Sequence, residues 1–186
     1  MMHRSSKACR LTTASLAGAA ALAAHAQQMP NPYGENVAVE AARRAAAAAI
    51  AEAKRNGWTV AAAVVDTGGD LVYFEKIDGT QHGSTHVAQE KARSSVMFKR
   101  PTKAFEDGVK GQAVNLLGLP GAVPLEGGVP IVVSGKIVGA LGVSGATSAQ
   151  DGQCARAGVE AIAGQGGRAE GTAPPPQQGA PPPAKK

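Results

Sequence analysis

Two histidines stand four residues apart near the middle of the chain, and they are the strongest candidates for chemistry. His82 and His86 are followed at the same spacing by Glu90. If a helix begins near Ser84, its positive end favours the neutral imidazole of His86, which is the form that binds a metal ion. A cluster of His82, His86 and Glu90 could then hold a metal. The alternative interpretation is a solvated helix face.

A glycine-rich segment resembles two functional motifs without matching either. Residues 142–146 read G-V-S-G-A, close to the G-x-S-x-G of α/β-hydrolases, but no histidine follows Ser144, as that triad requires. Gly139, Gly142 and Gly145 lack the G-x-G-x-x-G spacing of a dinucleotide site and begin inside a predicted strand. We expect these glycines to permit close backbone packing, or the approach of a flat ligand or a neighbouring subunit.

The first 26 residues are typical of a secretory signal peptide. Three basic residues (Arg4, Lys7 and Arg10) precede an uncharged apolar run over residues 11–24, and residues 24–26 read A-H-A, a small-residue cleavage site. The run is shorter than the roughly 20 residues that a membrane-spanning helix needs. We therefore expect cleavage after Ala26, a linker over residues 27–35, and a periplasmic or secreted protein.

Removal of this segment changes what the composition implies. The formal net charge of +5 falls to +2 without the three basic residues of the predicted signal peptide, which has no acidic residue. This excess is too small to indicate a nucleic-acid or membrane-surface partner. Cys154 would be the one remaining cysteine, so no intramolecular disulfide can form. We expect stability to come from packing and from assembly into a homo-oligomer.

Predicted helices alternate with predicted hairpins between residues 36 and 164. Asn36 can cap a first helix that runs to about Arg55, and Ser84 or Thr85 can cap a second that runs to about Lys99. Shorter patterns predict helices over residues 102–107 and 148–163, and strands over 58–65, 70–77, 129–133 and 136–144.

This order of elements indicates the fold class. The order helix, hairpin, helix, hairpin, helix predicts an antiparallel sheet flanked by helices, which is an α/β fold of the α+β type. We expect one compact domain over residues 36–164. Residues 165–186 are rich in proline and glycine and contain nothing apolar to bury. They are predicted to form a disordered tail.

Four ordered segments of this domain resemble the GlcG/HbpS family of haem-binding uptake proteins. They read AAAVVDTGGDLVYFEKIDG, QEKARSS, FKRPT and EGGVPIVVSGKIVGALGVSGATSAQD, and they fall between residues 60 and 162. The resemblance implies an antiparallel sheet flanked by helices and a compact oligomer. For some members it also implies export and non-covalent binding of haem.

From this resemblance we expect an exported haem or tetrapyrrole-binding protein that serves haem acquisition, storage or sensing, with no catalytic residue assigned. The iron ligand is sought among His86, His82, Tyr73, Met97 and a hydroxyl such as that of Thr147. A macrocycle could lie against the glycine-rich strands. The remaining cofactor-binding candidates are Gly127, Gly128, Pro130, Gly142, Ser144 and Gly145.

Two alternatives stay open. One is an enzyme, or an accessory to an enzyme, that acts on a small organic acid through Arg93, Lys91 or Lys136, with Glu90 or Glu126 as a base. The other is a structural oligomer without a catalytic role. Binding of a small-molecule ligand would distinguish the haem-binding protein and the organic-acid protein from the structural oligomer.

Overall fold

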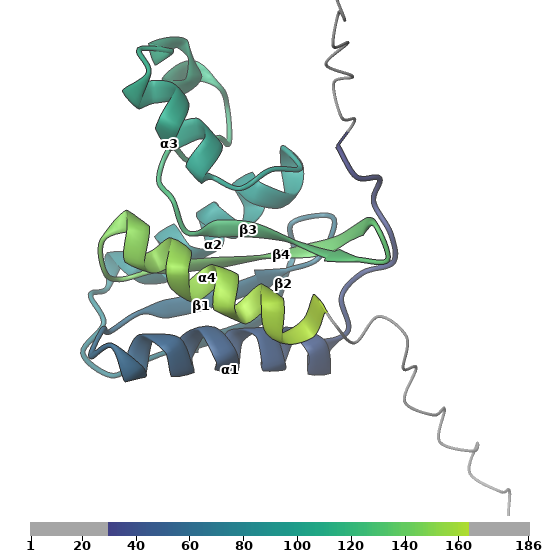
Figure 1. The fold of residues 1–186 in the computed structure, drawn as a ribbon, viewed down its shortest axis with the longest axis vertical. Coiled ribbons are helices and arrows are strands. Elements are labelled where there is room, and N and C mark those ends of the chain that lie inside the picture. Colours follow the sequence, from purple (N-terminus) through teal and green to yellow (C-terminus); the bar gives the residue numbers. More distant parts are fainter. Residues whose placement is uncertain (1–29, 164–186) are drawn as a thin grey trace, which may run out of the picture.

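The structure, a computed structural model, describes residues 30–163 (Figure 1). The predicted signal peptide and the predicted tail lie outside the described residues. Among the described residues no helix is both long and apolar enough to cross a bilayer.

A four-stranded antiparallel sheet forms the centre of the domain. Its order is β2-β1-β4-β3, so the two hairpins meet where β1 pairs with β4. The strands are β1 (Ala61–Val65), β2 (Leu71–Lys76), β3 (Gly128–Val133) and β4 (Lys136–Ser144). Every residue of β1 is buried, because this central strand is covered on both faces.

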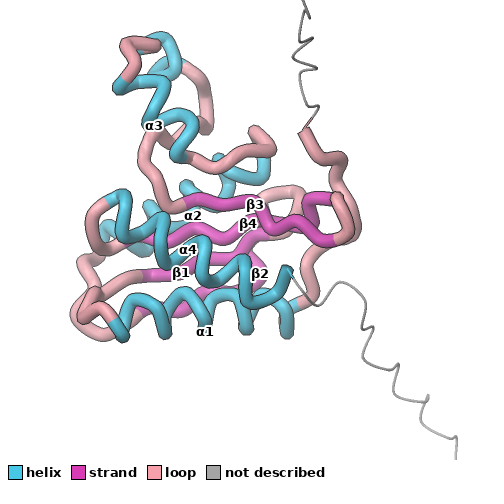
Figure 2. Tube along the Cα trace, in the orientation of Figure 1, coloured by secondary structure: helices cyan, strands magenta, loops and turns pink. Residues whose placement is uncertain are grey.

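Helices cover both faces of the sheet (Figures 1 and 2). Helices α1 (Val39–Arg55) and α4 (Ser148–Ala163) pack on each other and on one face. Helix α2 (Gly83–Met97) packs on the other face, against β1, β3 and β4. The first face buries the larger core, which includes Val64, Ile131 and Leu141. The predicted α+β fold, an antiparallel sheet flanked by helices in a single domain, is confirmed.

The helix starts differ from the sequence prediction. Helix α1 begins at Val39, and Asn36 does not cap it. The Asn36 amide instead donates to the Asp66 carboxylate at 3.0 Å, and its oxygen accepts from the Thr67 amide at 3.2 Å. Asn36 therefore fixes the turn of the first hairpin, because this turn supplies both a donor and an acceptor.

The segment before α1 lies along β4. Tyr33 forms a parallel bridge with Ile137, at the end of β4 that β1 does not reach. The Tyr33 hydroxyl donates to the Val96 carbonyl at 2.9 Å, and the Lys99 ammonium lies 4.2 Å from the centre of the Tyr33 ring. Part of the segment predicted as a linker is thus anchored to both the sheet and α2.

A 30-residue excursion, residues 98–127, separates α2 from β3 and projects from the domain (Figure 1). It contains α3 (Lys103–Lys110) and the 3-10 helix η1 (Val114–Gly118). Thr102 closes its base: the Thr102 hydroxyl donates to the Leu125 carbonyl at 2.6 Å and accepts from the Gly128 amide at 2.9 Å. The backbone amide of Thr102 also donates to the Gly128 carbonyl at 3.0 Å.

Candidate functional site

The two histidines lie at the exposed start of α2. His82 is the residue before the first turn and has helical backbone angles, and His86 lies in that turn. Both side chains are exposed, so they are available to a ligand from solvent. The sequence prediction placed His86 correctly in the first helical turn.

The predicted three-residue metal cluster is not assembled. The described part of the chain contains no group of three or more His, Cys, Asp or Glu side chains that could hold a metal ion. Glu90 instead accepts a hydrogen bond from Arg93 at 2.6 Å, one turn farther along α2. In this conformation the Glu90 carboxylate is turned toward Arg93, and a metal role of His82, His86 and Glu90 together stays a prediction.

Tyr73 lies on the opposite side of the sheet from the histidines. Its register partner in β1 is Val64, and both side chains pack in the core that α1 and α4 cover. The next residue, Phe74, packs instead with Ala88 of α2. Tyr73 and His86 therefore cannot contact the same small ligand in one subunit.

The glycine candidates contact the protein itself. A Cβ on Gly142 would lie 2.6 Å from the Ala92 amide nitrogen and still closer to the Ala88 carbonyl oxygen, both in α2. Gly128 lies in the same way against the carbonyl oxygen of Lys91. Backbone atoms of α2 already occupy the space over these two glycines. In this subunit the glycines therefore allow α2 to lie close to the sheet, and they leave no room for a macrocycle.

The other candidates in this segment are also engaged by the fold. Gly145 lies against the Thr59 carbonyl oxygen, and Gly127 lies against the Val143 carbonyl oxygen. Ser144 is buried, and Pro130 is half-buried in β3, which is an edge strand. The sequence analysis expected these glycines to allow either close backbone packing or the approach of a ligand or subunit. Within the subunit they allow close backbone packing.

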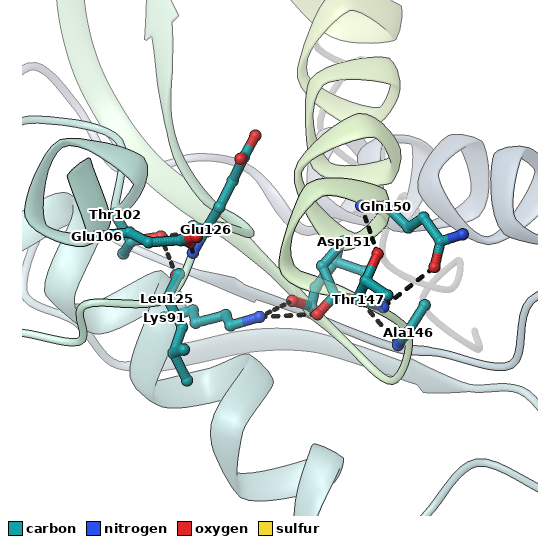
Figure 3. A network of polar contacts seen from close by, with 11 residues as sticks. Lys91, Thr102, Glu106, Leu125, Glu126, Ala146, Thr147, Gln150 and Asp151 are labelled. Atoms are coloured by element: carbon teal, nitrogen blue, oxygen red, sulfur yellow. Dashed lines mark hydrogen bonds and ion pairs between the residues drawn. The ribbon is translucent and has the colours of Figure 1, made fainter. Parts of the chain in front are cut away.

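A buried ion pair that the sequence analysis missed joins the two sides of the sheet (Figure 3). The Lys91 ammonium on α2 donates to the Asp151 carboxylate on α4 at 2.8 Å, and the two side chains are 2% and 3% exposed. The same ammonium donates to the Val143 carbonyl at 3.1 Å. The other Asp151 oxygen accepts from the Ala146 amide at 3.0 Å. Two helices on opposite faces are thereby held to the end of β4.

Burial dominates the electrostatics of this pair. Loss of solvent raises the pKa of Asp151 above its ordinary value, and the nearby Lys91 charge and the backbone donors only partly oppose this rise. The pair thus has good geometry but a large desolvation penalty. Because Lys91 is buried and already paired, it is not available as an anion contact for a small organic acid.

The neighbouring carboxylates are engaged as well. Glu126 is almost buried, and its carboxylate accepts from Arg156 at 2.6 Å. Glu106 accepts a hydrogen bond from the Glu126 backbone amide, which ties α3 to the start of β3 (Figure 3). Glu126 is therefore a structural ion-pair partner in this subunit, and its surroundings do not favour the role of a base.

The buried cysteine of the described residues is not a nucleophile. Cys154 is buried in α4, and burial raises its pKa to about 11. It therefore stays a neutral thiol near neutral pH, whereas thiolates are the reactive form.

A capping box, which the sequence analysis missed, lies at the start of α4. The Thr147 hydroxyl accepts from the Gln150 amide at 3.4 Å, and the Gln150 side chain accepts from the Thr147 amide at 3.1 Å (Figure 3). The T-x-x-Q spacing indicates this arrangement directly. It orients the first turn of α4, from which Asp151 reaches Lys91.

The fold and these sites define a small α+β domain with exposed imidazoles at the start of α2 and a buried ion pair between α2 and α4. The chain belongs to the HbpS-like family, described as haem-degrading protein HbpS-like, whose family model matches residues 37–160. The predicted membership of the GlcG/HbpS family is confirmed, and the family is one of haem-binding proteins.

Two curated relatives agree with this assignment. The GlcG protein of Escherichia coli K12 is 41% identical over 98 residues, which cover 53% of this chain and 73% of GlcG. A 15.0-kDa protein encoded in the dhaT–dhaS intergenic region of Citrobacter freundii is 30% identical over 119 residues, or 62% of this chain and 84% of that protein.

Solved structures share the fold. The crystal structure of HbpS is 35% identical with a TM-score of 0.65, over 69% of this chain and 92% of that chain. A double mutant of Streptomyces reticuli HbpS gives 35% identity and a TM-score of 0.64, over 69% and 88%. The PduOC haem complex, at 23% identity and a TM-score of 0.62, covers 68% of this chain and 95% of that chain and shows the same fold.

Proposed function

We propose that this protein is exported to the periplasm or secreted, assembles as a homo-oligomer, and binds haem non-covalently for acquisition, storage or sensing. The observation that carries the proposal is the exposed pair His82 and His86 at the start of α2 in a chain of the HbpS-like family. Imidazole is a common haem-iron ligand, and both rings are open to solvent.

The positions of the candidate residues support haem binding at the outer side of α2. His86, and His82 beside it, can reach a ligand that approaches the outer side of α2. Gly128 and Gly142 face α2 itself, and Tyr73 lies beyond the sheet. The iron would thus be held by an imidazole from α2, and any cover over the macrocycle would come from the outer surface of this helix or from another subunit.

Replacing His86 by alanine should shift the Soret band of the haemin complex and weaken haemin binding at least tenfold, because an iron ligand is lost. His82→Ala should have the smaller effect. Absorption titration of the mature protein with haemin measures both. Tyr73→Phe is the matched control and should leave the spectrum and the affinity unchanged, because Tyr73 lies on the opposite side of the sheet.

The His82→Ala/His86→Ala double variant decides the ligand. If it keeps the wild-type spectrum and affinity, histidine ligation is wrong. If the wild-type protein shows no saturable spectral change, haem binding itself is wrong and the small-acid alternative replaces it. Since the family description names haem breakdown, the complex should also be followed over time: a stable Soret band supports binding, and its decay supports degradation.

Export gives a separate expected result. Protein recovered from the producing cell's periplasm or medium should begin at Gln27, because residues 24–26 form the predicted cleavage site. Intact-mass spectrometry reads this end directly. Recovery of the protein in the cytoplasmic fraction with Met1 retained would contradict export without affecting the haem proposal.

A further inference from the structure

We infer that the end of the excursion between α3 and β3 is the surface through which copies of this chain associate. This end, called the tip below, is residues 111–125. The inference rests on the proposed homo-oligomer and names the part of the chain that forms it.

The tip concentrates the exposed apolar side chains of the described structure. Eight large apolar residues are exposed among residues 30–163, and four of them fall in this 15-residue segment. Val114 is 64% exposed and Leu117 is 62% exposed, with Leu119 at 38% and Leu125 at 45%. Scattered apolar residues are normal on a protein surface, but a local cluster of this kind indicates an interaction site.

The geometry of η1 gathers two of these side chains on one side. In a 3-10 helix, residues three apart lie on the same face, so Val114 and Leu117 form a continuous apolar ridge. Leu116 points elsewhere and lies against Gly108 of α3. Leu116 of η1 thus packs within the excursion, whereas the ridge of Val114 and Leu117 faces solvent.

The C-terminal end of the tip is bound to the base of the excursion and to α2. Thr102 closes the base through Leu125 and Gly128, and the Glu126 amide donates to Glu106. The Val123 amide donates to the Ser94 hydroxyl of α2 at 3.0 Å. These bonds fix the C-terminal end of the tip, and η1, which carries the ridge, projects from the domain as a formed surface (Figure 1).

Charge indicates what covers the tip. Residues 111–125 contain no Asp, Glu, Lys, Arg or His, so the tip offers nothing to a nucleic acid or to a charged protein surface. An uncharged apolar patch can meet its own copy about a two-fold axis without like-charge repulsion. The chain's own residues 164–186 contain no Val, Ile, Leu, Met or aromatic residue and are a poor match for the ridge. A second copy of the chain is the occupant that these facts favour.

Sedimentation velocity of the mature wild-type protein and of Leu117→Glu tests the inference. We expect the wild-type protein to sediment as an oligomer, and Leu117→Glu to sediment at the monomer mass with an unchanged far-UV circular dichroism spectrum. Val114→Glu, on the same ridge, should do the same. Val39→Glu is the matched control, because Val39 is 56% exposed on α1, and it should keep the assembled mass.

The possible outcomes distinguish failure of the tip as the interface from failure of the proposed homo-oligomer. An assembled Leu117→Glu and Val114→Glu would overturn the tip as the interface while leaving the homo-oligomer intact. A monomeric wild-type protein would overturn both, and haemin titration of that monomer would still test haem binding. Flotation of the wild-type protein with phosphatidylcholine vesicles, lost in Leu117→Glu, would show that the tip binds lipid and overturn self-association.

Discussion

Replacing Lys91 by methionine should lower the free energy of unfolding by about 3–5 kcal/mol. Methionine fills much of the same space, but the buried Asp151 carboxylate then loses its partner 2.8 Å away and cannot regain water. Asp151→Asn should lower it by a similar amount, since it leaves the Lys91 ammonium buried and unpaired. Equilibrium unfolding in urea, followed by circular dichroism, measures both losses.

The double variant Lys91→Met/Asp151→Asn shows whether the loss comes from an unpaired charge. With neither charge present, the loss in the free energy of unfolding should be smaller than the sum of the two single losses. The difference from that sum should be about 1–3 kcal/mol. Asparagine keeps an acceptor for the Ala146 amide, so that contact does not confuse the comparison. Strictly additive losses, or single losses below about 1 kcal/mol, would contradict a coupled buried pair.

A matched control for these variants is an exposed ion pair on the same helix. Arg93 and Glu90 lie 2.6 Å apart, but their side chains are 36% and 52% exposed. Removal of the Glu90 charge, in Glu90→Gln, should change the free energy of unfolding by only about 1 kcal/mol or less, because water replaces the lost partner and Arg93 keeps its hydrogen bond to the Gly69 carbonyl. The difference between the two pairs isolates the effect of burial.

The arrangement of elements was predictable because each one has a local pattern. The alternation of β-rich and turn-rich segments placed both hairpins, and the structure has strands at Leu71–Lys76 and Lys136–Ser144 where they were expected. Helix starts were less predictable, because a capping residue has competing partners. Asn36 suits a cap, yet it bonds to the hairpin turn at Asp66 and Thr67, more than 25 residues away in the sequence.

The site was predictable only where it depends on neighbours in sequence. His82 and His86 were found from their spacing and from the expected helix start, and both are exposed on α2. Lys91 and Asp151 are 60 residues apart, so no local spacing joins them, and their pairing exists only after α2 and α4 have packed around the end of β4. The opposite placement of Tyr73 and His86 likewise depends on the strand register, which the sequence pattern does not specify at single-residue precision.

The glycines of β3 and β4 show how one pattern can support two readings. A strand glycine indicates that something approaches the backbone closely, but it does not tell whether this is a ligand or another part of the chain. Here it is the chain: Gly128 and Gly142 lie under the backbone of α2, and Gly158 of α4 lies against the Ala45 carbonyl of α1. Small residues on both sides bring the layers together, which suits a core with few aromatic side chains.

Gly142→Ala should therefore lower the free energy of unfolding by at least about 3 kcal/mol, the upper end of the usual overpacking range. The added methyl group would meet three atoms of α2: the Ala88 carbonyl oxygen, the Ala92 amide nitrogen 2.6 Å away, and the Ala92 Cβ 3.0 Å away. Two of these are backbone atoms of a regular helix, so no side-chain rotation relieves the clash. Helix α2 must shift as a body, which also disturbs the Lys91 ion pair one turn away from Ala88.

Gly83→Ala is the matched control, because Gly83 begins the same helix and a Cβ there would have no neighbour within 4 Å. It should leave stability unchanged or raise it by up to about 1 kcal/mol, since alanine favours the helix more than glycine does. Urea unfolding compares the two variants directly, and haemin titration of Gly142→Ala at low temperature shows whether the shift of α2 carries His86 with it. A Gly142→Ala protein as stable as the wild type would mean that α2 does not rest on β4 at this glycine, and the glycine-rich strand would again be open to a ligand.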